Sequence, residues 1–296
     1  MADLPAGTSF GTLVHAILET TDPTAPDLLA ELHLRSTEQL ARRPAGIGAE
    51  QLAGALLATL STPLGPIADG LALRDLPASD RLAELDFELP LAGGDRPDGH
   101  QRVENGSDSA AFGRPDSDIT LGDVGDLLRT RLHPGDPLAG YARRLSSPGM
   151  SRQSLRGYLT GSLDAVFRLP GPRYVVADYK TNWLGEFGAG LGEAGPRLSA
   201  WHYRPEALDE AMAGSDYPLQ ALLYCVALHR FLRWRQPGYD PERHLGGVLY
   251  LFVRGMCGVA NPEVDGRPCG VFGWQPPADL VVDLSALLDA KPAGSS

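Results

Sequence analysis

The sequence has very little lysine, little cysteine and no long apolar segment. Of its 26 basic residues, only Lys180 and Lys291 are lysines. The three cysteines are odd in number and lack C-x-x-C spacing, which argues against a disulfide framework, a zinc ribbon or a four-cysteine iron–sulfur cluster. The apolar runs, such as residues 247–253, are too short to cross a bilayer. The first residues lack the basic and apolar regions of a signal peptide, so we expect a cytoplasmic protein.

The composition is that of a globular protein with an acidic balance. The 296 residues are 43% hydrophobic and 21% charged, which suffices for a buried core in one large domain or two small ones. The net charge of -11 argues against a simple basic nucleic-acid binder, but not against an enzyme that uses carboxylates to hold a metal. Because lysine is so rare, Lys180 marks a position where arginine would not serve, whereas Lys291 lies in a Pro/Gly/Ser tail.

The hydrophobic pattern predicts a mixed α/β fold around a central sheet. Helical spacing, and in one case a run of short helices, is found in residues 8–20, 26–42, 48–60, 121–146, 216–235 and 278–289. Strands are predicted from alternating or continuous apolar character at 82–90, 155–169, 174–181 and 247–254. Asp216 is expected to cap the helix that follows it. Residues 92–119 are rich in Gly, Asp, Ser and Pro, which indicates a long loop.

The clearest local signal is a hairpin in which Pro170-Gly171-Pro172 joins two strands. If this loop is three residues long, Asp164 lies opposite Asp178, and Lys180 shares their face because side chains alternate along a strand. Two facing carboxylates are unfavourable in an apolar hairpin unless a divalent cation such as Mg²⁺ lies between them. A bulge would break this pairing, and an ordinary solvated face is the alternative.

Such a site would support phosphodiester hydrolysis. A metal polarises a phosphate oxygen and lowers the pKa of a bound water. The Lys180 ammonium would position or deprotonate that water, or stabilise the developing negative charge.

These residues resemble the PD-(D/E)XK nuclease superfamily and, within it, the C-terminal nuclease domain of the RecB family of exodeoxyribonuclease V (RecBCD). The resemblance spans nearly the whole chain, with residues 92–150 matching least. It is carried by five segments, which are residues 11–15 (GTLVH), 157–167 (GYLTGSLDAVF), 178–185 (DYKTNWLG), 217–232 (YPLQALLYCVALHRFL) and 246–256 (GGVLYLFVRGM). Asn182-Trp183 after the lysine favours the RecB type over the related AddA type.

The resemblance implies a role for each matching residue near the hairpin. Asp164 and Asp178 would be catalytic metal ligands, and Lys180 would be the catalytic lysine. His15 and the main-chain carbonyl of Tyr179 would be further metal ligands. The alternative for His15 is a buried histidine of the core, since it lies on an apolar helix.

Three more residues match the family's motifs. Glu84 matches an acidic residue on the preceding strand and would orient metal or water, although Asp86 and Glu88 share its strand face. Gln220 and Tyr224 lie one helical turn apart, match a Gln-x-x-x-Tyr element, and would contact DNA or support the site. Their alternative is a buried hydrogen-bonded pair with no substrate contact.

Five arginines in the C-terminal third of the chain have two possible roles. They could form a phosphate-binding face or an ordinary solvated face, and they are Arg230, Arg233, Arg235, Arg243 and Arg254. His229 and His244 are expected to be structural.

The resemblance implies a restriction-endonuclease-like fold, with a mixed central sheet flanked by helices and a helical N-terminal region. The expected division is 1–80 as the helical part carrying His15, 81–91 as the first core strand, 92–150 as a variable loop with short helices, 151–290 as the nuclease core and 291–296 as a tail.

The implied function is Mg²⁺-dependent hydrolysis of DNA, with Ca²⁺ able to occupy or inhibit the site. The implied activity is that of an exodeoxyribonuclease with endonuclease action on single-stranded DNA unwound by a helicase, in double-strand-break repair and recombination. The implied partners are DNA, a helicase motor and RecC- and RecD-like subunits, with no membrane. Because the chain has no G-x-x-x-x-G-K-[ST] loop, we expect a nuclease module without its motor.

Two functions of other classes compete with this one. A nuclease-like scaffold would bind DNA or partner subunits without cutting. A serine hydrolase would use Ser9 in residues 7–11 (GTSFG), although that motif needs a strand before it.

Overall fold

The computed structural model describes residues 4–91, 119–155, 158–185 and 198–289. The chain forms two compact units, each built from three stretches. Unit 1 holds residues 1–85, 163–215 and 246–275, and unit 2 holds residues 86–162, 216–245 and 276–296. Strands β1 (Arg81–Pro90) and β2 (Tyr158–Leu169) each run on from one unit into the other. Among the described residues, no helix has the length and apolar character that would span a membrane.

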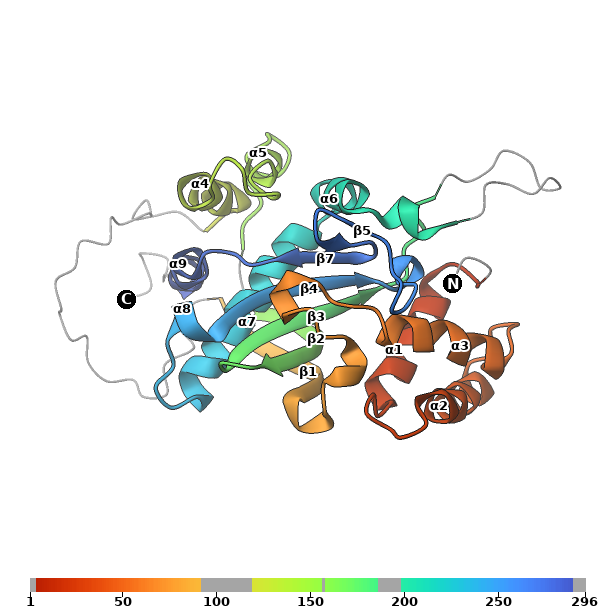
Figure 1. Ribbon diagram of the computed structural model, residues 1–296. Coiled ribbons are helices and arrows are strands. Elements are labelled where there is room, and N and C mark those ends of the chain that lie inside the picture. The colour runs from red at the N-terminus through yellow and green to blue at the C-terminus, as the bar shows by residue number, and fades with distance from the viewer. Residues whose placement is uncertain (1–3, 92–118, 156–157, 186–197, 290–296) are drawn as a thin grey trace. The chain divides into compact units, whose positions relative to one another are not determined.

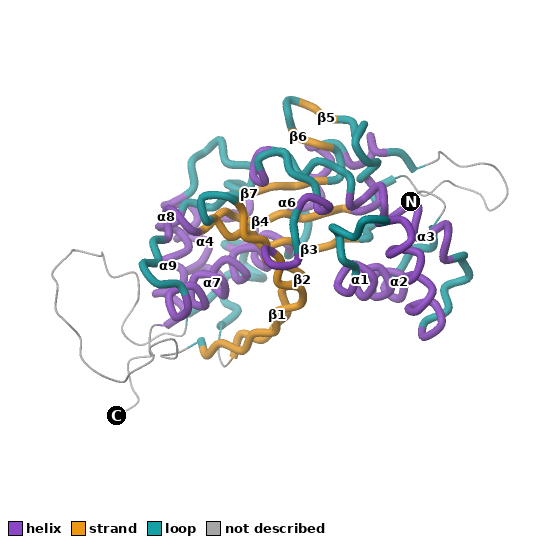
Figure 2. The backbone as a smooth tube through the Cα atoms, turned by 60° about the horizontal axis from the view of Figure 1, so that its bottom comes forward, coloured by secondary structure: helices purple, strands orange, loops and turns teal. Residues whose placement is uncertain are grey.

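A central sheet organises the fold. Within the described ranges, five strands form this sheet in the order β1-β2-β3-β4-β7, where β3 is Arg173–Lys180, β4 is Leu245–Phe252 and β7 is Val271–Trp274 (Figures 1 and 2). Strands β2 and β3 pair antiparallel, as do β4 and β7. Every residue of β4 is buried, as its continuous apolar run predicts. The predicted class, an α/β fold with a mixed central sheet flanked by helices, is confirmed.

Three helices of unit 1 lie side by side: α1 (Thr8–Thr20), α2 (Leu28–Arg42) and α3 (Ala49–Leu60) (Figure 1). The apolar positions of α1 at helical spacing are all buried, and these are Phe10, Leu13, Val14, Ile17 and Leu18. They share one core with the inward-facing residues of the hairpin, which include Ala165, Phe167, Val175 and Ala177. This packing fixes α1 against the two strands that carry the predicted site.

The shorter elements of unit 1 were not predicted. They are η1 (Pro66–Ala68), η2 (Leu73–Asp75), η3 (Ala78–Asp80), η4 (Ala200–Tyr203), α6 (Pro205–Ala213), η5 (Val253–Gly255), β5 (Glu263–Val264) and β6 (Arg267–Pro268). Most are too short to show a hydrophobic period. The strand predicted at 247–254 ends earlier, at Phe252, because η5 follows it.

Unit 2 is mainly helical. It contains α4 (Leu121–Arg131), α5 (Tyr141–Leu145), α7 (Tyr217–Arg235), α8 (Pro241–His244) and α9 (Ala278–Asp289). Helix α9 packs against α4, α7 and α8. Of the segments predicted from the sequence, residues 92–118 of the long loop and the tail 291–296 lie outside the described residues.

Asp216 lies at the predicted N-cap position of α7, but its side chain makes no capping hydrogen bond. One oxygen of its carboxylate instead accepts a hydrogen bond from Arg144 Nη2 at 3.0 Å. The predicted position is therefore confirmed, whereas the capping hydrogen bond expected there is not formed.

Gly247 provides a test of the sheet. Its φ is +99°, and a Cβ atom there would lie 2.5 Å from the Trp274 carbonyl oxygen. We expect Gly247→Ala to lower the free energy of unfolding by about 2 kcal/mol or more, because the new methyl group meets backbone that cannot give way. Denaturant titration measures this loss. Gly54→Ala is the control, since a Cβ at that exposed helical position meets nothing within 4 Å. Equal unfolding midpoints for the two variants would contradict the close approach of Gly247 to the Trp274 backbone.

Candidate active site

The hairpin has the register on which the predicted site depends. Strands β2 and β3 are joined by the three residues 170–172, and their paired positions run from Leu169 opposite Arg173 to Ala165 opposite Ala177. The next residues along the two strands are Asp164 and Asp178. The predicted three-residue loop and its register are therefore confirmed, and both carboxylates lie at the same end of the hairpin.

Asp178 is a buried carboxylate paired with a lysine. Only 3% of the residue is exposed, and its Oδ2 lies 2.5 Å from Lys180 Nζ. The ammonium also lies 5.3 Å from the centre of the Tyr250 ring, which helps to fix its position. Burial raises the pKa of Asp178 to about 6, and the Asp164 charge adds to this, while the Lys180 charge opposes it.

Asp164 is held by the strand opposite and by α1. Its Oδ2 accepts a hydrogen bond from the Tyr179 backbone N–H at 2.8 Å. Its Oδ1 lies 3.2 Å from His15 Nδ1. Asp164 and Asp178 thus have different surroundings: backbone and imidazole for Asp164, and ammonium and core for Asp178.

His15 reaches the site from α1. Its Nε2 lies 2.8 Å from the Tyr179 carbonyl oxygen, so both ring nitrogens face oxygen atoms. Burial lowers the pKa of His15, but the hydrogen bond and charge of Asp164 and the charge of Asp178 outweigh burial and raise it overall. Helix α1 approaches closely at Gly11, where a Cβ would lie 3.1 Å from Thr181 Oγ1. His15 is half-buried with protein oxygens beside both ring nitrogens, as a structural histidine could also be, so its role as a metal ligand stays a prediction.

The donor atoms around Asp164 and Asp178 are of the kind that a divalent cation binds. Among the described residues, no three His, Cys, Asp or Glu side chains are arranged as a ready-made metal cage. The oxygens at this end of the hairpin are nevertheless the hard donors that Mg²⁺ prefers: two carboxylates and the Tyr179 carbonyl. Mg²⁺ usually takes only one or two protein carboxylates and keeps several waters. The residues therefore fit the ion by their chemistry.

Glu84 lies on β1 and faces a second acid. The residue is exposed and has a φ of +47°, which is unusual for a residue other than glycine. Its carboxyl lies near that of Glu19 on α1. The pKa of Glu19 is raised by burial and by its contact with Glu84. Glu19 was not predicted, although its place one helical turn after His15 was a usable signal.

Gln220 and Tyr224 form the predicted pair in unit 2. Gln220 Nε2 donates a hydrogen bond to Tyr224 Oη at 2.7 Å. The buried Tyr224 ring also meets the Phe87 ring edge to face, with centroids 6.2 Å apart. The two side chains thus support each other, and their contact with DNA stays a prediction.

Comparison with curated proteins finds relatives that share one name, RecBCD enzyme subunit RecB. The chain is 54% identical over 291 residues to the protein of Mycolicibacterium smegmatis and 54% identical over 293 residues to that of Mycobacterium tuberculosis. It is 31% identical over 294 residues to the protein of Escherichia coli. Over nearly its whole length the chain is similar to one segment of these RecB proteins. Each match covers 98% of this chain but only 25%, 24% and 19% of the relative, so the chain spans about a quarter of the mycobacterial RecB length. No protein-family model matches it.

Two of the arginines proposed for a phosphate-binding face are buried. Arg230 donates to the Ser285 hydroxyl and carbonyl and to Asp289, and Arg254 is equally enclosed. The prediction of an exposed position is wrong for Arg230 and Arg254. The sequence does not show which side of an apolar helix or strand end packs against the core. Arg233, Arg235 and Arg243 are exposed.

His229 and His244 are buried inside unit 2. His229 Nδ1 lies 2.8 Å from Tyr239 Oη, and His244 Nδ1 accepts a hydrogen bond from the Asp240 backbone N–H. These contacts agree with the structural role expected for both.

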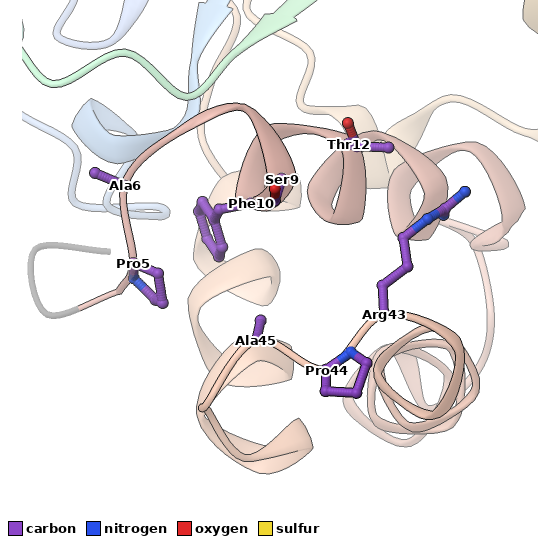
Figure 3. A pocket seen from close by; sticks show the side chains of 8 residues that line it. All are labelled: Pro5, Ala6, Ser9, Phe10, Thr12, Arg43, Pro44 and Ala45. Atoms are coloured by element: carbon purple, nitrogen blue, oxygen red, sulfur yellow. The ribbon is translucent and has the colours of Figure 1, made fainter.

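Ser9 lies beside a pocket and away from any strand. The pocket has a volume of about 600 Å³ and is lined by Pro5, Ala6, Ser9, Phe10, Thr12, Arg43, Pro44 and Ala45 (Figure 3). The described residues before Ser9, 4–8, contain no strand, and Ser9 belongs to the first turn of α1. The turn between strand and helix that a serine nucleophile needs is not formed, so the serine-hydrolase alternative is wrong.

Arg254 joins the segments that converge on the site. Its guanidinium donates to the carbonyls of Thr181, Leu4 and Pro5, and it lies against the rings of Phe10 and Trp183. Burial lowers its pKa. One cation thus ties the residue after Lys180 to the segment that leads into α1, a role that the apolar sequence around Arg254 did not indicate.

We expect Arg254→Met to lower the free energy of unfolding by about 3 kcal/mol, because it leaves buried carbonyl oxygens without donors. Urea titration measures the change. The control is Arg152→Met at an exposed arginine, for which we expect less than about 0.5 kcal/mol. Similar small effects in both variants would show that Arg254 does not hold these segments together.

Proposed function

We propose that this chain is a metal-dependent nuclease module of the PD-(D/E)XK type and that it hydrolyses phosphodiester bonds in DNA. The observation that carries the proposal is the convergence of Asp164, Asp178 and Lys180 at one end of the β2–β3 hairpin, with His15 and the Tyr179 carbonyl beside them. Two acids and a lysine on one hairpin face are costly for stability alone, and they are the groups that this hydrolysis uses.

The proposed roles follow from the contacts. Asp164, Asp178, His15 and the Tyr179 carbonyl would hold Mg²⁺, which when bound polarises a phosphate oxygen and lowers the pKa of a water. Because Asp178 is buried, its carboxylate interacts with a cation more strongly than it would in water. Glu84, which faces Glu19, would orient water from the β1 side.

Lys180 is the proposed group that acts on the attacking water or on the negative charge of the phosphate. Its side chain is largely buried between Asp178 and the Tyr250 ring. An ammonium held in this way can position the attacking water with a hydrogen bond to its oxygen, or stabilise a phosphate oxygen as negative charge develops. In its neutral form the amine could instead accept a proton from that water. Arginine would remain charged throughout, whereas lysine can also lose its proton.

The substrate and partners are proposed from the same site and from the RecB relatives. A net charge of -11 gives weak affinity for DNA phosphates, so we propose that the module acts as an exonuclease, with endonuclease action, on single-stranded DNA delivered by a helicase. Because each relative is named a subunit of the RecBCD enzyme, we propose RecC- and RecD-like partners and a role in double-strand-break repair and recombination.

Cleavage of end-labelled single-stranded DNA tests the chemistry. We expect Asp178→Asn and Lys180→Met each to lower the rate about 10²- to 10⁴-fold, because each removes a group that acts on the reacting phosphate. The control is Glu88→Gln, which changes an exposed acid of β1 and should leave the rate unchanged. Circular dichroism checks folding. Cleavage by Asp178→Asn at the wild-type rate would overturn the proposal.

Metal binding is measured separately from activity. If Mg²⁺ or Ca²⁺ binds the folded chain, its addition at a hundred times the dissociation constant should stabilise the protein by about 2.7 kcal/mol. We expect thermal unfolding to show this gain in the wild-type chain and in Glu88→Gln, and to show none in Asp178→Asn. A folded wild-type chain that takes up neither ion would identify a scaffold that does not cut.

A further inference from the structure

Trp201 is a large aromatic side chain left facing solvent. It lies on η4, just before α6, and 57% of the residue is exposed. The Arg204 guanidinium lies 5.5 Å from the centre of its indole ring. Arg204 is held there by a hydrogen bond to the Trp201 carbonyl at 3.1 Å and by an ion pair with Glu206 at 3.8 Å. The two side chains form a cation–π pair at the surface of unit 1.

The turn that carries Trp201 is anchored to the segment that follows Lys180. Tyr203, two residues after Trp201, is fully buried. Its hydroxyl donates to the carbonyl of Asn182 at 2.7 Å and accepts from the Leu184 N–H at 3.4 Å. Asn182 is only two residues beyond Lys180, so a few covalent bonds and one hydrogen bond link η4 to the reactive end of β3.

Tyr203 also packs against η5. A Cβ at Gly255 would lie 2.4 Å from Tyr203 Cβ, so η5 and η4 touch at van der Waals distance. The turn that carries Trp201 is therefore anchored to the segment that follows Asp178 and Lys180. An aromatic side chain has few rotatable bonds, so it loses little conformational entropy when a ligand covers it.

We propose that Trp201 and Arg204 form a stacking platform for one unpaired nucleobase of the DNA strand that is cut at Asp178 and Lys180. An indole face beside a guanidinium suits any of the four bases, because every base has a π-face. In a chain with net charge -11, base stacking also supplies affinity that phosphate contacts supply poorly. The inference rests on the proposed nuclease function and deepens it by naming a contact for single-stranded substrate.

The experiment measures binding of a fluorescein-labelled 12-nucleotide single strand to the full chain, with Ca²⁺ in place of Mg²⁺. We expect Trp201→Ala to weaken affinity about 5- to 100-fold, and Trp201→Phe to retain most of it. Trp234→Ala is the matched control, because Trp234 is 61% exposed and stacked with Arg235 at 4.0 Å but lies in unit 2. It should bind as the wild-type chain does.

Abasic oligonucleotides locate the stacked base. In the wild-type chain, removal of the base at one position should weaken binding as much as Trp201→Ala does. The same abasic position should cost nothing further in Trp201→Ala. With Mg²⁺, Trp201→Ala should raise KM while kcat at saturating DNA stays unchanged, because the platform binds the strand and does not act on the phosphate.

The outcomes separate this inference from the proposed function. Wild-type cleavage with unchanged affinity in Trp201→Ala overturns the platform and leaves the nuclease proposal standing. Equal losses in Trp201→Ala and Trp234→Ala also overturn the assignment to Trp201. A folded wild-type chain that neither binds nor cuts the strand overturns both.

Discussion

The antiparallel pairing of β2 with β3 is the constraint on which the candidate site depends. Side chains alternate between the faces of a strand, so a slip of one residue would turn Asp164 away from Asp178. The three-residue loop and the buried Ala165, Phe167, Val175 and Ala177 oppose such a slip, because it would bring apolar side chains to the wrong face. The core of unit 1 therefore sets the position of the two acids.

The site also brings acidic groups close to titratable basic groups, and the surrounding fold must hold them together. Burial disfavours the ionised form of Asp178, and Lys180 offsets only part of this effect, as the raised pKa of Asp178 indicates. Burial lowers the pKa of His15, but the hydrogen bond and charge of Asp164, together with the charge of Asp178, outweigh burial and raise the pKa of the imidazole overall. The burial of each ionisable group costs stability by itself. The arrangement persists because Arg254 and the core around α1 hold the converging segments in place.

The sequence was sufficient to predict the elements with a strong hydrophobic period. Helix α1, the β2–β3 hairpin, its register and helix α9 were predicted in nearly the observed positions, because each combines such a period with clear turn residues. The contact of His15 with Asp164 was expected only from a family resemblance, since no local rule brings residues so distant in the chain together.

Other features depend on tertiary packing that a single sequence does not reveal. Arg254 and Arg230 were expected at a surface, but they are buried because backbone carbonyls, a serine and a carboxylate meet them in the core. Turn η4 and strand β7 are too short to show a period. The pairing of Glu19 with Glu84 joins a helix and a strand that are distant in the chain, and periodicity describes only neighbours.

Tyr179 lies between Asp178 and Lys180, and its ring is buried in the core of unit 1. Its main chain meets the site, where its N–H donates to Asp164 and its carbonyl lies beside His15 Nε2. Any amino acid except proline would supply these two main-chain groups. The ring adds a contact that few residues could replace, since it meets the His15 imidazole edge to face with the centroids 5.9 Å apart. A mutation that repacks the interior at residue 179 would therefore reach the functional groups of the site through His15.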